Sequence, residues 1–168
     1  ALACGIDRAS VFTAASETFN RRNVRAGIAE SIERFRPVAD GARRAGIGLR
    51  GYVSTAFVCP FEGPIPPAAV ADVARRLCDL GCEEISFGDT IGAATPAQVD
   101  ALLDALEPVL PADRIALHLH DTRGTALSNI LVGLQRGVAR FDSSAGGLGG
   151  CPFAPGAAGN LATEDLVY

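Results

Sequence analysis

The chain has 168 residues, a length typical of one domain with room for a buried core. Its hydrophobic fraction of 48% and mean hydropathy of +0.23 are typical of a well-packed α/β protein and exclude a disordered chain. The net charge of −4 and the short, interrupted apolar runs exclude a basic nucleic-acid-binding face and a membrane span, so we expect neither nucleic acid nor membrane as a partner.

The first half of the chain reads as strands alternating with helices. A strand over residues 10–15 precedes a helix over 28–45, which Gly46 ends and whose inward stripe is Ile28, Ile32, Phe35, Ala39 and Ala42. A strand over 49–56 leads to a helix that Pro66 and Pro67 open and Gly81 ends, with an inward stripe of Val70, Val73, Leu77 and Leu80.

The same alternation continues in the second half. After a strand over 84–88, Thr95 is the expected N-cap of a helix with Pro96 at its first position and an inward stripe of Val99, Leu102, Leu103 and Leu106. A strand over 115–120 precedes a helix expected to pack through Leu127, Ile130, Leu131 and Leu134. A strand over 140–144 follows, and a last helix begins at 163–165.

This pattern predicts parallel β/α units in a single domain over residues 1–168. Polar residues fall where the strands end, which is where an α/β barrel carries its chemistry: Ser16, Glu17, Ser54, Asp89, Thr90, His118, His120, Asp121 and the loop 146–151. A doubly wound open sheet is the alternative, but no Gly-x-Gly-x-x-Gly turn follows a first strand. We therefore expect part of a (β/α)8 barrel.

The two histidines of the chain, His118 and His120, stand two residues apart in one predicted strand. Side chains at i and i+2 point to the same face, so both imidazoles are placed to hold one divalent metal ion, with Asp121 available to orient the site. Imidazole, carboxylate and amide ligands favour Mg²⁺ or Mn²⁺ over a thiolate-rich zinc site. The simpler alternative is two satisfied polar residues at a strand end.

Further candidates lie near the C-terminus. Cys151 sits in a glycine-rich loop, where an exposed thiol can act as an acid or base; an ordinary loop cysteine is the alternative. Asn160 is a candidate metal ligand or a turn residue. Glu164 and Asp165 are candidate site residues that equally suit the start of a helix.

Polar groups elsewhere have structural alternatives too. Ser54, Asp89 and Thr90 suit a binding site, but also caps and turns. Arg21 and Arg22 suit phosphate binding or a solvated charged face.

The cysteines indicate the compartment. The five cysteines, an odd number without a C-x-x-C motif, indicate neither a disulfide framework nor a zinc ribbon, so we expect the cytoplasm. Cys78 and Cys82 are spaced to share a helix face, and we expect them to pack against the sheet rather than bind metal.

Seven segments together resemble the hydroxymethylglutaryl-CoA lyase family, among the metal-dependent lyase and synthase barrels. They span nearly the whole chain in the family's order and include the specific Gly-Leu-Gly-Gly-Cys-Pro loop: residues 14–17, 50–54, 59–63, 86–92, 118–122, 147–153 and 159–165.

The resemblance implies cleavage of 3-hydroxy-3-methylglutaryl-CoA to acetyl-CoA and acetoacetate, the chemistry of leucine degradation and ketone body metabolism, by a homodimer. It implies that His118, His120 and Asn160 ligate Mg²⁺ or Mn²⁺ and that Cys151 is catalytic, with His118 a candidate proton shuttle. Residues that would line the substrate site are Tyr52, Ser54, Asp89, Thr90, Glu164 and Asp165.

The chain departs from the family at its start. The family's first strand carries an arginine and a metal-binding aspartate, and neither motif is present; the five strands here look like strands four to eight. Because the chain also starts at Ala1 and lacks methionine, we expect a fragment of a longer protein, inactive alone. We further expect two open sheet edges and a partly exposed, apolar barrel interior.

Two other functions fit the same residues. A related metal-dependent barrel, such as an isopropylmalate or homocitrate synthase or a hydroxy-oxo-acid aldolase, shares the paired histidines, although the Cys-Pro loop argues against it. A non-catalytic remnant serving as a dimerisation or metal-binding module is the third interpretation; retention of the later site residues speaks against it.

Overall fold

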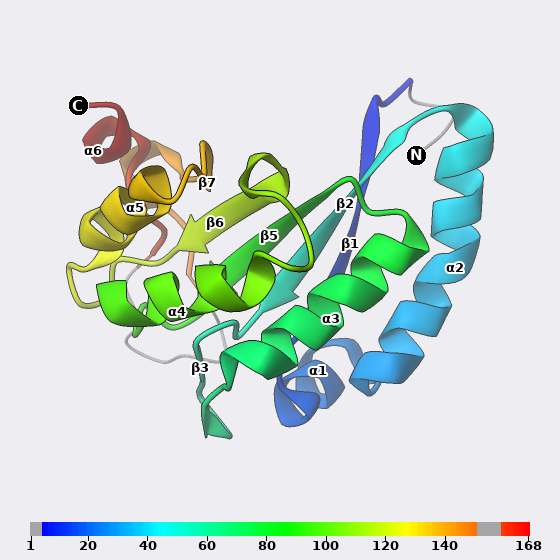
Figure 1. Cartoon of the computed structure of the whole chain (residues 1–168), viewed down its shortest axis with the longest axis horizontal. Helices are drawn as coiled ribbons and strands as arrows, with labels where there is room; N and C mark the ends of the chain where they lie inside the picture. The colour runs from blue at the N-terminus through cyan, green and yellow to red at the C-terminus, as the bar shows by residue number, and fades with distance from the viewer. Residues whose placement is uncertain (1–4, 151–158) are drawn as a thin grey trace.

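The structure, a computed structural model, describes residues 5–150 and 159–168 and contains one five-stranded parallel sheet (Figure 1). Its strands follow chain order, with every neighbouring pair parallel: β1 (Arg8–Ala14), β2 (Gly48–Ser54), β5 (Glu84–Asp89), β6 (Ile115–Leu119) and β7 (Arg140–Asp142). The five predicted strands are confirmed, with ends that differ by at most two residues. β1 and β7 form the two edges of this sheet, as expected.

Helices follow the strands. The longer ones are α1 (Glu17–Val24), α2 (Ile28–Ala45), α3 (Pro67–Leu80), α4 (Pro96–Leu106) and α5 (Ala126–Gln135). The shorter elements are η2 (Ala112–Arg114), η3 (Ala145–Gly147), α6 (Thr163–Val167) and the hairpin strands β3 (Val58–Cys59) and β4 (Gly63–Pro64). No helix in the described part of the chain combines the length and apolar character needed to cross a membrane.

Helix α1 was not predicted, because its sequence is polar and shows no apolar stripe. Its N-cap is Ser16, whose side chain accepts a hydrogen bond from the backbone N–H of Phe19 at 3.0 Å. Ser16, singled out as a polar group at a strand end, therefore caps a helix. Glu17 likewise pairs with Arg21 across one helical turn at 3.6 Å.

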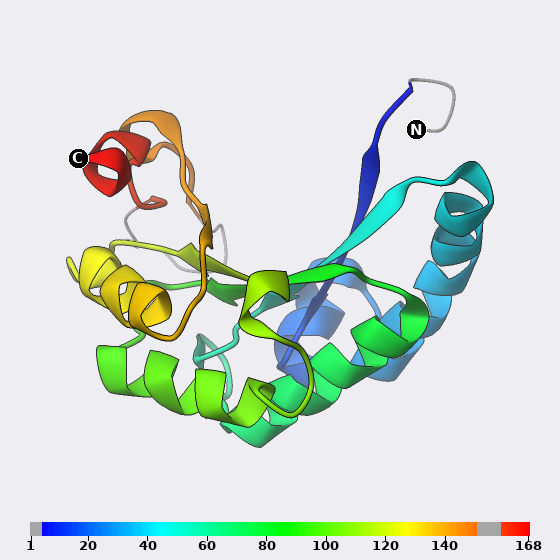
Figure 2. The ribbon, with the colours of Figure 1, turned by 45° about the horizontal axis from the view of Figure 1, so that its top comes forward.

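Helices α2 to α5 lie along one face of the curved sheet, and the edge strands rise on either side (Figure 2). A doubly wound sheet has helices on both faces and a reversal of strand order, and this sheet has neither. The fold is therefore a segment of a (β/α) barrel wall, as the position of the polar residues predicted.

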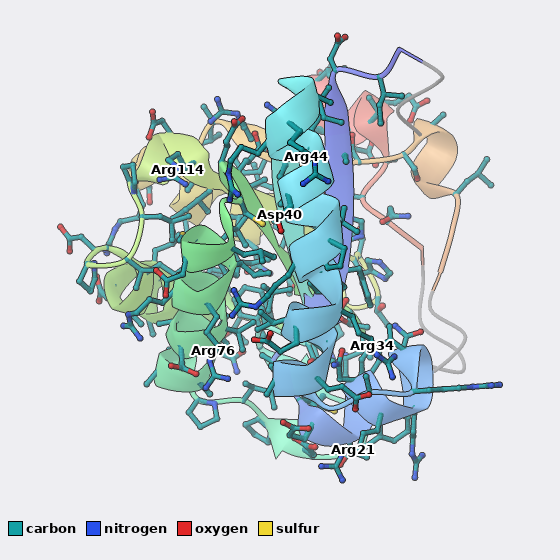
Figure 3. The ribbon with its side chains drawn as sticks, turned by 90° about the vertical axis from the view of Figure 1, so that its right-hand side faces the viewer. Arg21, Arg34, Asp40, Arg44, Arg76 and Arg114 are labelled. Carbon is teal, nitrogen blue, oxygen red and sulfur yellow. The ribbon has the colours of Figure 1, made fainter. Side chains whose placement is uncertain are left out.

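The core lies between this face of the sheet and the helices. The strands contribute Val53, Ile85, Phe87, Leu117 and Leu119, all buried, and the helices contribute the predicted stripes of α2, α3 and α4. The outward faces of the helices are charged: in Figure 3, Arg34 and Arg44 of α2 point away from the sheet, and Arg34 pairs with Glu30 at 2.6 Å. These helices thus have one buried and one solvated face.

The predicted stripe of α5 was largely wrong. Leu127, Leu131 and Leu134 are 48%, 55% and 53% exposed, and of the four predicted residues only Ile130 is buried. The buried face consists of Ala126, Asn129, Ile130 and Gly133. At Gly133 a Cβ atom would lie 2.8 Å from Leu117 Cδ1, so the helix approaches β6 through small residues and its leucines turn outward.

Cys78 and Cys82 do not share a helix face. Helix α3 ends at Leu80, and Gly81 follows with φ of 108°, so Cys82 lies beyond the helix. Its thiol packs against Gly51 of β2, and burial raises its pKa to about 12. The expected packing against the sheet is confirmed for Cys82, which is buried, and Cys78 is half-buried.

Candidate active site

The carboxyl end of β6 is joined to a segment close to the C-terminus. Asn160 forms an antiparallel bridge with His120, and the N–H of Leu161 donates to the carbonyl of Leu119 at 3.1 Å. On its other side the same segment pairs with the end of β7, where the N–H of Ser144 donates to the carbonyl of Leu161 at 3.1 Å. The fold thus brings Asn160 next to the two histidines, as the predicted metal site requires.

The two histidines share one site but differ in environment. Their ring centroids lie 5.4 Å apart, with the planes at 47°. The side chain of His118 is 33% exposed, and its Nδ1 atom lies 3.4 Å from Asp142 Oδ2. His120 is buried, and burial, together with the neighbouring His118, lowers its pKa. His120 is therefore neutral near pH 7 and keeps a nitrogen lone pair for a ligand.

Within the part of the chain that the structure describes, two buried atoms at this site have no hydrogen-bond partner: His120 Nδ1 and Asn160 Oδ1. The amide nitrogen of Asn160 donates to the carbonyl of Leu148 at 3.0 Å, so it is the amide oxygen that is available to a ligand. Burying such groups unpaired costs free energy, and a divalent cation would bind both. The residues present therefore fit a metal ion.

Potential metal ligands are not clustered in residues 5–150 and 159–168. These ranges contain no cluster of three or more His, Cys, Asp or Glu residues suited to hold a metal ion. A site here consequently depends on the Asn160 oxygen and on further ligands from water, substrate or other parts of the protein.

Sequence reasoning missed an ion-pair network on the face of the sheet opposite the helices. Arg50 on β2 is its centre: Nε lies 2.8 Å from Glu84 Oε1 and Nη2 lies 2.8 Å from Asp142 Oδ1. Glu84 also pairs with Arg8 at 3.2 Å and with Arg140 at 3.1 Å. The expectation of an apolar barrel interior was therefore wrong for this face, because its strands place charged residues at alternate positions.

Asp142 links this network to the histidines. Its Oδ2 atom accepts a hydrogen bond from Ser86 Oγ at 2.8 Å and faces His118. Burial by itself would raise the pKa of Asp142, but the hydrogen bonds from His118, Arg50 and Ser86 lower it to about 2. Asp142 is therefore ionised at neutral pH, although it is largely enclosed.

Asp89 and Thr90, predicted to contact substrate, are engaged within the protein. The two carboxylate oxygens of Asp89 accept hydrogen bonds from the N–H groups of Ala93 and Ala94 at 2.9 and 3.0 Å, and burial raises the pKa of this carboxyl. Thr90 Oγ1 accepts from the N–H of Thr55 at 2.7 Å. These contacts match the alternative roles as caps and turns.

Tyr52 and Ser54 lie on β2, on the same face of the sheet as Arg50. The Arg50 guanidinium stacks over the Tyr52 ring, 4.7 Å from its centroid, and burial raises the pKa of the Tyr52 hydroxyl. Ser54 is half-buried at the last position of the strand. The Oδ1 atom of Asp121 accepts a hydrogen bond from the N–H of Ala126 at 2.9 Å, so this carboxylate caps α5.

Two further candidates, Glu164 and Asp165, are exposed on α6. The Oε2 atom of Glu164 accepts from the N–H of Gly146 at 2.8 Å, and hydrogen bonds from its own backbone and from Gly146 lower its pKa. Cys151 lies outside the described residues. Arg22 stacks on Phe61, 4.1 Å from the ring centroid, consistent with a packing role.

Comparisons with known proteins agree on one family. The HMGL-like family matches residues 1–168. The mitochondrial hydroxymethylglutaryl-CoA lyase of Rattus norvegicus is 55% identical over the whole chain, which covers 52% of that protein. The hydroxymethylglutaryl-CoA lyase of Bacillus subtilis is 52% identical, again over the whole chain and 56% of that protein. The chain thus spans about half the length of these curated relatives.

Solved structures agree with the sequence relatives. The HMG-CoA lyase of Brucella melitensis superposes with a TM-score of 0.95 at 52% identity, covering 98% of this chain and 58% of that one. An HMG-CoA lyase from Acinetobacter baumannii, solved with coenzyme A and 3-methylmalate, gives a TM-score of 0.92 at 37% identity, covering 99% of this chain and 54% of that one. These likenesses confirm the barrel fold.

Proposed function

The chain belongs to the HMGL-like family, and from this premise we propose that the protein containing it cleaves 3-hydroxy-3-methylglutaryl-CoA to acetyl-CoA and acetoacetate with a divalent metal ion, Mg²⁺ or Mn²⁺. The observation that carries the proposal is a pair of buried atoms beside His118, His120 Nδ1 and Asn160 Oδ1, that have no hydrogen-bond partner among the described residues. We propose these three residues as the metal ligands that the chain supplies.

The chemistry follows from the substrate. A bound divalent ion supplies Lewis acidity that lowers the pKa of the tertiary hydroxyl. A general base takes the hydroxyl proton, the new carbonyl forms as the neighbouring carbon–carbon bond breaks, and the electron pair of that bond passes to the acetyl-CoA fragment as an enolate. We propose that Cys151 protonates the enolate carbon, which completes acetyl-CoA and leaves acetoacetate.

The substrate class and the assembly are part of the proposal. The relatives are named hydroxymethylglutaryl-CoA lyases, and the Acinetobacter structure was solved with coenzyme A, which supports an acyl-CoA substrate. Tyr52 and Ser54 lie in the carboxyl-terminal half of β2, and we propose that they line the substrate site. The homodimer stays a prediction. The cytoplasmic location also stays a prediction, because the names of relatives include both mitochondrial and cytoplasmic proteins.

The test is acetoacetate release from the acyl-CoA substrate by the whole protein, with and without Mn²⁺. We expect release that depends on the metal, and a loss of about 100-fold or more in Cys151→Ala, the size typical of a proton-transfer group. Cys78→Ala is the matched control, because this half-buried cysteine lies on α3. Near-normal turnover by Cys151→Ala would favour a related synthase or aldolase instead.

We also propose that the 168-residue chain alone is inactive. Among the described residues, β1 and β7 have one neighbour each in the sheet, so this part of the wall is open on both sides. Metal-dependent turnover by the isolated chain would refute this expectation.

A further inference from the structure

The inner face of the sheet connects four strands through one carboxylate. Asp142 on β7 lies directly opposite His118 on β6 in the strand register, so their side chains are neighbours on one face. Arg50 reaches Asp142 from β2, and Ser86 reaches it from β5. The carboxylate is therefore held from three directions, and among the described residues it contacts the candidate metal site through His118.

We propose that Asp142 is the positioning residue for His118: it accepts the Nδ1–H of the ring and so directs Nε2 towards the metal ion. The inference rests on the proposed function, because it assigns a role within that metal site. Asp142 does not ligate the metal in this arrangement and acts only through the histidine.

The hydrogen bonds around Asp142 indicate that His118 is the donor and Asp142 the acceptor in their contact. Arg50 Nη2 and Ser86 Oγ both donate to Asp142, so its oxygens act as acceptors, and the 3.4 Å contact with His118 Nδ1 is a hydrogen bond when the ring carries its proton on Nδ1. A ring with its single proton on Nδ1 has its lone pair on Nε2, the atom left for a ligand. Metal-bound histidines commonly donate their second N–H to a carboxylate in this way, which fixes both tautomer and ring orientation.

The position of the carboxylate is itself fixed. Arg50 Nη2 donates to both oxygens of Asp142, at 2.8 and 3.0 Å, and Ser86 Oγ donates to Oδ2 at 2.8 Å. Arg50 is in turn held by Glu84 at 2.8 Å. A carboxylate tied at this many points has little freedom to turn away, so it gives His118 one preferred orientation.

The two histidines are consequently not equivalent. His118 Nδ1 faces a carboxylate, whereas His120 Nδ1 has no partner among residues 5–150 and 159–168. With one nitrogen bonded to Asp142, His118 has a single lone pair and is unable to ligate the metal and accept the substrate proton at once. The inference therefore assigns His118 to ligation and moves the proton acceptor to another group.

The first measurement is the tautomer of the His118 and His120 rings by ¹⁵N NMR of the metal-free whole protein, with the two signals assigned from variants that lack one histidine each. We expect Nδ1–H at His118 in the wild type and a shift towards Nε2–H in Asp142→Ala. Asp142→Asn, which keeps an acceptor oxygen, should restore the Nδ1–H form in part. Asp121→Asn is the matched control: it changes an aspartate beside His120 that caps α5, and the tautomer of His118 should not move.

The second measurement is Mn²⁺ affinity of the whole protein by calorimetry. We expect affinity to fall about 10- to 100-fold in Asp142→Ala and less in Asp142→Asn, as for other residues that orient metal ligands. An Nε2–H tautomer at His118 in the wild type, or an unchanged tautomer and affinity in a natively folded Asp142→Ala, would overturn the inference. Absence of Mn²⁺ binding in a wild type with the Nδ1–H tautomer would instead overturn the proposed function.

Discussion

Protonation of Asp142 in acid should lower the free energy of unfolding, and the pKa of this carboxyl gives the size of the effect. Burial raises the pKa of this carboxyl, but hydrogen bonds from His118, Arg50 and Ser86 outweigh it and lower the pKa from 3.8 to about 2. A pKa that is lower in the folded state contributes stability above the unfolded value, and this stability is lost as pH falls through the folded value. The difference of nearly two pH units corresponds to about 2 kcal/mol.

The test compares the wild type with Asp142→Asn, which carries no titrating group at this position. Roughly half of the contribution should be gone by about pH 3, so the difference in unfolding free energy between the two proteins should shrink by about 1 kcal/mol between about pH 6 and about pH 3. Because the chain has no tryptophan, urea unfolding is best followed by far-UV circular dichroism.

A control separates this effect from general charge removal. Asp113→Asn removes an exposed carboxylate in η2, away from the network, and sets the baseline at both pH values. If the wild type and Asp142→Asn differ equally at both pH values once this baseline is subtracted, the ion pairs around Asp142 do not hold its charge as described, and the reasoning fails.

Three further predictions concern Thr90 after β5, the N-cap of α4 and the candidate metal site. Thr90→Val leaves the buried N–H of Thr55 without its acceptor and should cost about 1–3 kcal/mol in urea unfolding; a loss below about 0.5 kcal/mol would contradict the role of this contact. Thr95→Ala removes the capping box of α4 and should cost about 1 kcal/mol, with faster hydrogen exchange confined to the first turn; uniform exchange across the helix would speak against a local cap. Mn²⁺ should raise the Tm of the whole wild-type protein, reversibly with a chelator, and raise it less in His120→Ala and Asn160→Ala; equal shifts in all three would place the metal elsewhere.

Local patterns in the sequence were sufficient to predict most helices and their ends. The apolar stripe of α2 predicts its bounds, Ile28–Ala45, even though Pro37 lies within it and removes one backbone hydrogen bond. Gly81 and Thr95 mark the end of α3 and the start of α4, because a left-handed C-cap and a capping side chain each need particular residues. These features depend on neighbours a few residues apart.

The paired histidines were also readable from sequence, since a strand fixes the direction of alternate side chains. The meeting of His120 with Asn160 was a prediction from the family resemblance, and their pairing across 40 positions is a property of the fold. Cys151 lies outside the described residues, so its proposed role still rests on that resemblance.

Packing between residues far apart in the sequence decided the features that local patterns did not predict. The sequence alone determined that strands and helices alternate, where most of them start and stop, and that two imidazoles share a face, because each of these follows from local geometry. Only the tertiary structure decided which face of α5 is buried, through the close approach at Gly133, and that Arg50, Glu84 and Asp142 meet on the inner face of the sheet. Arg50 and Asp142 are 92 positions apart, and no local pattern encodes a contact that depends on strand order and register.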